Sequence, residues 1–277
     1  MTAKSIVWLA SYPKSGNTWL RMFLANYLMN REEPLPLNDV AKLGFGDANP
    51  ALYARVAKRP IDPADHRACL ALRPRVLAAI TANRADVNLV KTHNARTTAF
   101  GTELVPAAVT RAAIYIVRHP LDMALSYARH YAMTVEHVVE AIQRDDHVIT
   151  GDRGSVPQYL GAWATHVRSW TRPRDFPVLT LRYEDLLDDP ATGFARALRH
   201  LGLPVEDERL ARAVRFSSFG ELKAQEETTG FVEQSANGVS FFNQGKAGQW
   251  RERLDPGLAD GFIAANRRAL DARGYAA

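Results

Sequence analysis

The sequence contains a single cysteine, Cys69, among its 277 residues. One thiol excludes an intramolecular disulfide framework, which agrees with a reducing compartment. Long apolar runs are also missing, since no stretch approaches the roughly 20 apolar residues that span a bilayer. The apolar stretch after Lys4 is too short for a secretory signal, and Lys14 interrupts it. We therefore expect a cytoplasmic protein with no membrane partner.

Two familiar nucleotide-binding patterns are absent as well. The Walker A pattern needs a glycine, four residues and then Gly-Lys-Ser/Thr, and the Rossmann pattern needs three spaced glycines. A Mg²⁺-dependent NTPase would also need an aspartate at the end of a central strand to hold the metal. No set of His, Cys and carboxylate residues has metal-ligand spacing. These absences argue against a P-loop kinase and predict a site without a metal.

The composition is that of a globular protein. Hydrophobic residues make up 47% of the chain and charged residues 23%, and the length suits one large α/β domain. The net charge of +5 would suit an anionic ligand, a nucleic acid or an acidic membrane surface. The arginines are dispersed and no nucleic-acid reading motif accompanies them, so we expect no nucleic-acid partner.

The stretch from residue 6 to residue 29 organises the chain. Residues 6–10 form a short apolar run typical of a buried strand, and Pro13 stops it. From Thr18 onward apolar residues recur at helical spacing, so a helix begins there. The first N–H groups of a helix are unpaired and its dipole favours negative charge. The turn adds a cation and several side-chain donors, namely Lys14, Ser15, Asn17 and Thr18. We interpret this stretch as a phosphate-binding loop.

Three further apolar runs have strand character, at residues 86–93, 111–117 and 176–181. Helical patterns are expected at residues 73–85, 120–127, 157–170, 190–201 and 205–216. The sequence therefore predicts an α/β fold, a single domain with a central parallel sheet flanked by helices. In such sheets ligands bind beyond the carboxyl ends of the strands. His93 and Arg118 stand at two of these ends, where chemistry is expected.

Three stretches have little periodicity. Residues 30–66 are rich in Pro and Gly, and we expect a cap over an acceptor pocket, with an irregular surface loop as the alternative. Residues 134–156 are polar and are expected to form a mobile connection. Residues 225–249 have few apolar anchors and several glycines, which indicates a lid.

The turn at residues 12–19 reads Tyr12-Pro13-Lys14-Ser15-Gly16-Asn17-Thr18-Trp19. It resembles the 5′-phosphosulfate loop of sulfotransferases that use 3′-phosphoadenosine 5′-phosphosulfate (PAPS), whose usual form is Tyr-Pro-Lys-Ser-Gly-Thr-Thr-Trp. Lys91-Thr92-His93 is similar to the family's Lys-Thr-His, and Arg118 with Ser126 is similar to its 3′-phosphate pair. The resemblance implies one sulfotransferase domain over residues 1–277 and PAPS as co-substrate, with no metal.

The resemblance also implies roles for individual residues. His93 would be the general base that takes the acceptor's proton, Lys14 would stabilise the leaving 5′-phosphate, and Lys91 would orient the sulfuryl oxygens. Tyr183, Ser217 and Phe219 would lie at the adenine base. The loop chemistry and the resemblance together give the expected donor-binding residues, which are Lys14, Ser15, Gly16, Asn17, Thr18, Trp19, Arg118, Ser126, Tyr183, Ser217, Phe219, Asn243, Gln244 and Gly245.

Two segments depart from the family pattern. Asn94-Ala95 stands where the family has Leu-Pro, which predicts a different acceptor side of the pocket. Asn243-Gln244 stands where the family has Arg-Lys. Nucleotide binding should then be weaker by roughly 1.5–3 kcal/mol for each lost charge-assisted bond, unless Lys246 supplies one cation. Glu184 and Asp185 are expected to cap the helix that follows them.

We therefore expect an enzyme that moves a sulfuryl group from PAPS to a hydroxyl or amine of a small-molecule acceptor. A P-loop nucleotide-dependent kinase or phosphotransferase is one alternative. A non-catalytic nucleotide-binding protein is another, which the two lost cations favour and the retained His93 and Lys14 oppose. The sequence does not specify the acceptor, and a homodimer is a reasonable expectation because dimers are common.

Overall fold

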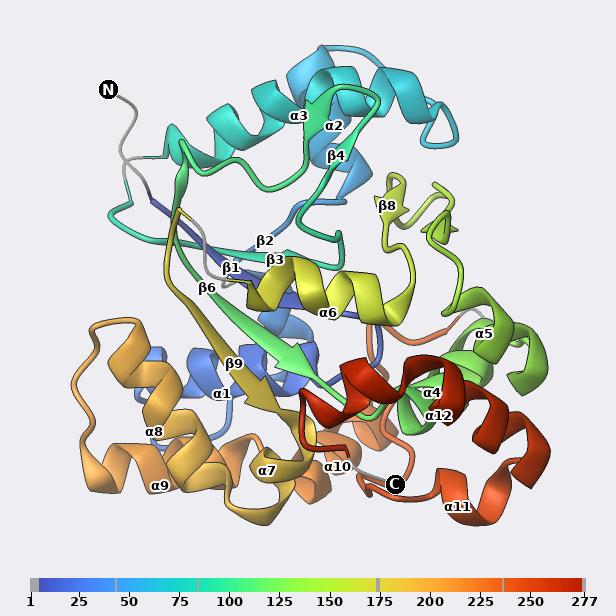
Figure 1. Cartoon of the computed structure of the whole chain (residues 1–277). Helices are drawn as coiled ribbons and strands as arrows, with labels where there is room; N and C mark the ends of the chain where they lie inside the picture. Colours follow the sequence, from blue (N-terminus) through green and yellow to red (C-terminus); the bar gives the residue numbers. More distant parts are fainter. Residues whose placement is uncertain (1–4, 43, 84, 173–174, 236, 276–277) are drawn as a thin grey trace. The chain divides into compact units, whose positions relative to one another are not determined.

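The computed structural model describes residues 5–42, 44–83, 85–172, 175–235 and 237–275. Five strands of this part of the chain form a central sheet, in the spatial order β2 (Phe45–Gly46), β3 (Asn88–Thr92), β1 (Ile6–Ser11), β6 (Thr110–Val117) and β9 (Val178–Arg182). β1 and β2 both pair in parallel with β3, and Trp8 lies opposite Val90. Helices flank the sheet (Figure 1), so the predicted α/β fold with a central parallel sheet is confirmed.

The remaining elements are short hairpins and helices. The hairpins pair β4 (Thr98–Ala99) with β5 (Thr102–Glu103) and β7 (Val148–Ile149) with β8 (Gln158–Tyr159). The helices are α1 (Asn17–Met29), the 3-10 helix η1 (Leu37–Lys42), α2 (Pro50–Ala57), α3 (His66–Thr81), α4 (Pro120–Tyr131), α5 (Val135–Ala141), α6 (Trp163–Thr171), α7 (Tyr183–Asp188), α8 (Pro190–His200), α9 (Asp207–Phe216), α10 (Phe219–Thr229), α11 (Trp250–Arg253) and α12 (Pro256–Asp271).

The chain forms two compact units, each assembled from separate stretches. The described residues of the first unit come from 5–12, 44–115 and 142–180. Those of the second come from 13–42, 116–141 and 181–275. The chain passes from the first unit to the second directly after Tyr12, at the start of the turn that precedes α1.

The strand and helix expected at residues 6–29 are confirmed. All residues of β1 are buried, and the indole Nε1 of Trp8 donates to Thr110 Oγ1 at 2.8 Å. α1 begins at Asn17, one residue earlier than expected, and ends before Asn30, whose φ of 48° is left-handed. Asparagine tolerates that conformation and is a common helix terminator.

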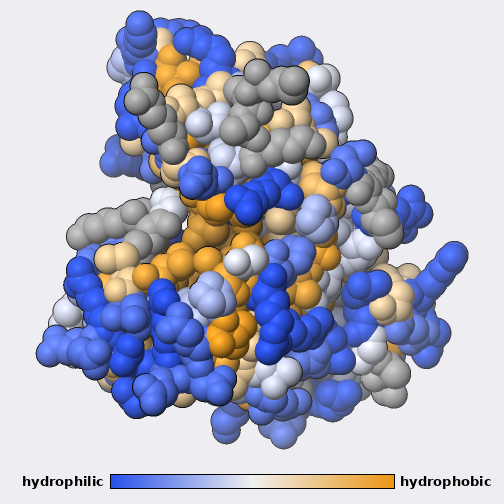
Figure 2. All heavy atoms as spheres, turned by 90° about the vertical axis from the view of Figure 1, so that its left-hand side faces the viewer, coloured by the Kyte–Doolittle hydropathy of each residue, from blue (hydrophilic) through white to orange (hydrophobic). Residues whose placement is uncertain are grey.

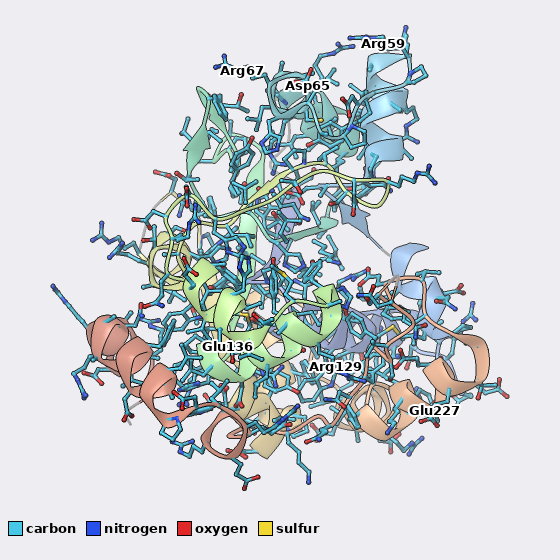
Figure 3. All side chains as sticks on the ribbon, turned by 90° about the vertical axis from the view of Figure 1, so that its right-hand side faces the viewer. Arg59, Asp65, Arg67, Arg129, Glu136 and Glu227 are labelled. Carbon is cyan, nitrogen blue, oxygen red and sulfur yellow. The ribbon has the colours of Figure 1, made fainter. Side chains whose placement is uncertain are left out.

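The stretch 30–66 is more regular than expected, because it contains η1, β2 and α2. Pro50 occupies the first turn of α2, where its missing N–H costs nothing, so it starts a helix rather than breaking one. α2 lies beside α3 (Figure 1). α3 begins at His66, well before the expected residue 73, because Asp65 caps it by accepting from Ala68 N at 2.9 Å. Asp65, Arg59 and Arg67 are exposed (Figure 3).

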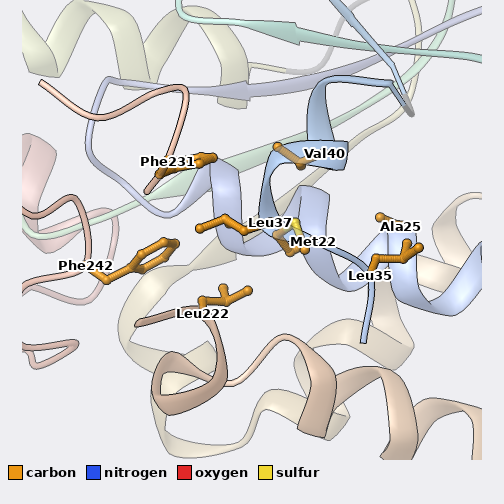
Figure 4. Packing of buried hydrophobic residues seen from close by; sticks show 8 residues of the cluster. All are labelled: Met22, Ala25, Leu35, Leu37, Val40, Leu222, Phe231 and Phe242. Carbon is orange, nitrogen blue, oxygen red and sulfur yellow. The ribbon is translucent and has the colours of Figure 1, made fainter. Parts of the chain in front are cut away.

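The second unit has a hydrophobic cluster that joins α1 to distant segments (Figure 4). Its buried members are Met22, Ala25, Leu35, Leu37, Val40, Leu222, Phe231 and Phe242. The stretch 225–249, predicted to be a lid, is anchored in this cluster by Phe231 and Phe242, which are 6% and 9% exposed. The buried carboxylate of Glu226 adds to this anchoring, because it accepts hydrogen bonds from the backbone N–H groups of Phe241 and Phe242.

Residues 134–156 also contain more structure than a simple connection. α5 lies there, and its Val138 and Val139 are buried. The expected helix at 157–170 is shorter than predicted, because β8 occupies residues 158–159 and α6 begins at Trp163.

Hydrophilic side chains form most of the surface on the face shown in Figure 2. Among the described helices, none is both long and apolar enough to cross a bilayer.

Candidate functional site

The turn between β1 and α1 has an unusual backbone. Lys14 and Gly16 both adopt left-handed conformations, with φ values of 65° and 104°. A Cβ atom at Gly16 would lie 2.8 Å from Cδ2 of Tyr183, so only glycine fits without displacing that ring. The guanidinium of Arg118 holds the turn from the other side, because its Nη1 donates to the carbonyl of Lys14 at 3.1 Å. These contacts bring Lys14, Gly16, Arg118 and Tyr183 together.

The N-terminus of α1 has the properties of an anion site. Gly16 provides no side-chain cap, and the first turn has no acidic residue. The helix dipole and the first N–H groups therefore favour a negative ligand there. Ser15 is 1% exposed, and its hydroxyl has no hydrogen-bond partner among the described residues. A buried hydroxyl without a partner is costly, so a bound anion would stabilise it.

Arg118 connects three segments of the second unit. Besides its bond to Lys14, its Nη2 donates to the carbonyl of Lys246 at 3.2 Å, and its guanidinium lies 4.4 Å from the centre of the Tyr183 ring. Its Nε is buried and has no hydrogen-bond partner in the described part of the chain. Burial raises the pKa of Tyr183 even though the neighbouring Arg118 charge lowers it. Arg118 thus retains at least its Nε–H for a ligand.

The amine of Lys14 lies among aromatic groups that the sequence did not reveal. Its Nζ is 3.5 Å from the centre of the Phe241 ring and 3.4 Å from Nδ1 of His130. A cation over an aromatic face is stabilised by the quadrupole of the ring. The backbone N–H of Phe241 donates to the buried carboxylate of Glu226. This bond fixes the ring that contacts the Lys14 amine.

Thr18 and Arg21, on the first turns of α1, share a carboxylate. Thr18 Oγ1 donates to Oε2 of Glu233 at 3.3 Å, and Arg21 Nη1 lies 2.8 Å from its Oε1. The side chains of Arg21 and Glu233 are only 11% and 23% exposed. Sequence reasoning missed Glu233, because nothing in a polar stretch distinguishes one glutamate from another.

The residues expected at the adenine base differ in their surroundings. Trp19 and Tyr183 form an edge-to-face pair with ring centres 5.8 Å apart. Phe219 packs against Gly245, where a Cβ atom would lie 2.5 Å from the ring. Ser217 is fully buried, and its hydroxyl donates to the carbonyl of Ala213 at 2.8 Å.

The remaining donor-side expectations concern single polar residues. Ser126 is half-buried in α4, whereas Asn243, Gln244 and Lys246 are exposed.

The expectation that Glu184 caps the helix following it is wrong. Its carboxylate accepts instead from His119 N at 2.9 Å and from the hydroxyl of Tyr275 at 2.8 Å.

His93 lies in the first unit, directly after β3. Its Nδ1 is 2.8 Å from the carbonyl of Ser11, and a carbonyl can only accept. Nδ1 therefore carries a proton, so in the neutral ring Nε2 carries the lone pair, which is the form that a general base requires. Lys91 lies two residues earlier in β3, opposite Leu9. Ser11 was not predicted to take part, although it precedes the phosphate loop.

A second histidine supports the backbone at this point. Nε2 of His166 donates to the carbonyl of His93 at 3.1 Å, and the hydroxyl of Tyr115 lies 3.0 Å from its Nδ1. Burial lowers the pKa of His166 to about 4. His166 is therefore neutral near pH 7, which leaves its Nδ1 able to accept from Tyr115.

Positive charge is concentrated around His119 in the second unit. Burial and, after it, the charges of three guanidinium groups, from Arg251, Arg118 and Arg182, together lower the pKa of His119 to about 4. Its ring stacks on Trp250 with centres 4.9 Å apart. Three guanidinium groups therefore act on this buried ring.

Comparisons with known proteins agree on one family. The family model described as "Sulfotransferase domain" matches residues 4–274. Rat sulfotransferase 1 family member D1 is 25% identical over 256 residues, covering 89% of this chain and 77% of the rat protein. Human sulfotransferase 1E1 is 26% identical over 265 residues, covering 92% of this chain and 80% of the human protein.

Two solved structures share the fold. The crystal structure of mouse sulfotransferase SULT7A1 complexed with PAP has a TM-score of 0.60 and 21% identity, covering 96% of this chain and 85% of that one. The structure of retinol dehydratase in a complex with retinol and PAP has a TM-score of 0.65 and 21% identity, covering 98% of this chain and 82% of that one.

Proposed function

This chain belongs to the sulfotransferase family, and we propose that it transfers a sulfuryl group from PAPS to a hydroxyl or amine of a small-molecule acceptor in the cytoplasm. The observation that carries the proposal is the turn at residues 13–16. It combines a glycine that a Cβ atom would not fit, a buried hydroxyl without a partner on Ser15, and the guanidinium of Arg118 bonded to the same turn.

The residues around this turn fit the two phosphate groups of the donor. Ser15 and the N–H groups at the start of α1 would hold the 5′-phosphosulfate, as a helix N-terminus holds other anions. Arg118, with its buried Nε, and Ser126 would hold the 3′-phosphate. Tyr183 and Trp19 offer aromatic surface for the adenine. Two of the solved neighbours are complexes with PAP, the nucleotide that PAPS leaves behind.

When bound, PAPS supplies an activated sulfuryl group on a phosphate leaving group. The ammonium of Lys14 and the N-terminus of α1 would stabilise the negative charge on the transferred group and on the departing phosphate, as cations do in phosphoryl transfer. His93 accepts the acceptor's proton at Nε2, since its Nδ1–H is committed to the Ser11 carbonyl. Lys91 orients the sulfuryl oxygens.

Calorimetry and turnover together test this function. We expect adenosine 3′,5′-bisphosphate (PAP) to bind tightly and ATP with Mg²⁺ to bind weakly. Radiolabelled PAPS should then label one class within a panel of phenols, alcohols and amines. Retinol is a fair first alcohol, since a solved neighbour is a complex with it. Tight binding of ATP with Mg²⁺ but not of PAP would overturn the proposal, and PAP binding without any turnover would indicate a non-catalytic nucleotide-binding protein.

A further inference from the structure

A buried carboxylate lies behind the turn that bears His93. Asp47 directly follows β2 and is 1% exposed. Its Oδ2 accepts hydrogen bonds from three buried side chains, namely Arg73 Nη2 at 2.6 Å, Thr92 Oγ1 at 2.7 Å and Asn94 Nδ2 at 3.1 Å. Thr92 and Asn94 are the two neighbours of His93 in the chain, so one carboxylate oxygen holds the turn on both sides of that histidine.

The backbone of Asp47 also binds the strand that leads into this turn. Its N–H donates to the carbonyl of Lys91 at 3.1 Å. Within the turn, the N–H of Asn94 donates to Thr92 Oγ1 at 3.1 Å. The side chain of Asn94 also accepts from the N–H of Tyr159 at 2.8 Å. Residues 91, 92 and 94 are thus fixed to one another through Asp47, while the ring of His93 is oriented by Ser11.

Arg73 forms a buried ion pair with this carboxylate. Its side chain is 3% exposed, and Nε and Nη2 also donate to the carbonyl of Leu104 at 3.0 Å and 2.6 Å. A buried ion pair of this kind contributes little net stability compared with apolar packing, but it imposes strict geometry on its partners. General-base catalysis depends on such geometry, because displacing a reacting group by about 1 Å can cost roughly 10²-fold in rate.

We propose that Asp47 is a positioning residue for His93. Supported by Arg73, its carboxylate sets the conformation of residues 91–94 and thereby the direction of the imidazole. The proposal rests on the proposed function, in which His93 is the base. β2 and Asp47 would then support catalysis. Both lie within residues 30–66, the stretch predicted from the sequence to be an acceptor cap.

Removing the hydroxyl of Thr92 tests the proposal without leaving Arg73 unpaired. We expect Thr92→Val to lower kcat roughly ten- to a hundredfold, while the KM for PAPS and the Kd for PAP stay unchanged. Thr92→Ser keeps the oxygen and should restore most of kcat. Tyr53→Phe is the matched control, because the Tyr53 hydroxyl contacts Arg73 Nη1 at 3.4 Å on the same ion pair but does not touch the turn.

A second readout does not depend on the reaction. Long-range ¹H–¹⁵N spectra report the tautomer of His93, which we expect to be the Nδ1–H form in the parent and in Tyr53→Phe, and a mixture in Thr92→Val. A variant that loses stability but keeps both kcat and the parent tautomer would overturn the positioning role. If the parent protein turned over no acceptor with PAPS while the tautomer still shifted in Thr92→Val, the proposed function would fail and the positioning role would stand.

Discussion

The tautomer of His93 follows from one contact, the hydrogen bond of its Nδ1 to the Ser11 carbonyl at 2.8 Å. Nε2 is then the only ring atom that can accept a proton. We expect His93→Ala to lower turnover by roughly 10²-fold or more and to leave the Kd for PAP nearly unchanged. His137→Ala, at an exposed position of α5, is the control and should behave as the parent. Unchanged turnover in His93→Ala would remove His93 from the mechanism.

Gly16 is the residue on which the phosphate loop depends most. Its φ of 104° disfavours any side chain, and a Cβ atom would meet the Tyr183 ring at 2.8 Å. We expect Gly16→Ala to lower the free energy of unfolding by about 1–3 kcal/mol and to weaken PAP binding, measured by urea titration and calorimetry. The control is Gly261→Ala inside α12, where no atom lies near the added Cβ. It should raise the free energy of unfolding by about 0.5–1 kcal/mol.

Candidate site residues could be predicted from the sequence where adjacent residues form a recognisable motif. Lys14, Gly16 and Asn17 stand together between a strand and a helix, so their chemistry was predictable. Ser11 and Asp47 were not, because their partners are distant in sequence. Ser11 meets His93 across 82 residues, and Asp47 meets Thr92 across 45. Only the pairing of β1 and β2 with β3 brings those groups together.

Glu233, which follows α10 in the chain, places a carboxylate at the start of α1. Glu233 binds Thr18 and Arg21, on the helix end proposed to hold the 5′-phosphate. A fixed negative charge there opposes an incoming anion. We expect Glu233→Gln to tighten PAP binding roughly three- to tenfold. Calorimetry at low and high salt would measure the change, which should shrink as salt screens the charge.

The control for this prediction lies on the neighbouring helix. Glu227 is an exposed residue of α10 (Figure 3), and its carboxylate lies 3.9 Å from Lys223 Nζ. Glu227→Gln removes the same charge away from α1 and should leave the Kd for PAP unchanged. If Glu233→Gln weakened PAP binding instead, the carboxylate would belong to the donor-binding arrangement rather than compete with the donor.

Whole elements were predictable where periodicity is long or strongly apolar. β1, β3, β6 and the α1 helix gave clear patterns, and all four are present. Short elements did not, because η1, β2 and α2 are too brief to show a period against the prolines around them. Two isolated aromatics, Phe231 and Phe242, likewise gave no periodic signal in a polar segment. Only the packing of η1, α1 and α10 reveals them as anchors.

At the scale of the whole molecule, the division into two units was not predictable. Each unit is assembled from stretches separated by long intervals of the chain. The division does sort the predicted residues by role. His93 and Lys91 belong to the first unit, whereas the expected donor-binding residues all belong to the second. Under the proposed function, PAP binding therefore reports on the second unit, and the tautomer of His93 reports on the first.

Each unit also contains a buried histidine that resists protonation, His166 in the first and His119 in the second. Their pKa values are lowered from 6.5 to about 4, mainly by burial. Between these values the unfolded chain binds protons that the folded chain does not. The stabilisation is therefore complete above about pH 6.5 and is lost as the pH falls towards 4, by up to about 3 kcal/mol for each histidine.

The variant His166→Gln tests this stabilisation, since its amide can still donate to the carbonyl of His93 and does not titrate. Urea unfolding at about pH 7 and about pH 4.5 should show the parent losing more free energy of unfolding than His166→Gln. His119→Asn, which keeps an acceptor for the N–H of Leu121 at the start of α4, should flatten the pH dependence in the same direction. A difference between parent and His166→Gln that stayed constant with pH would mean that the buried ring binds its proton as readily in the folded chain as in the unfolded one. In that case the hydrogen bonds of His166 to Tyr115 and to the His93 carbonyl would not depend on a neutral ring.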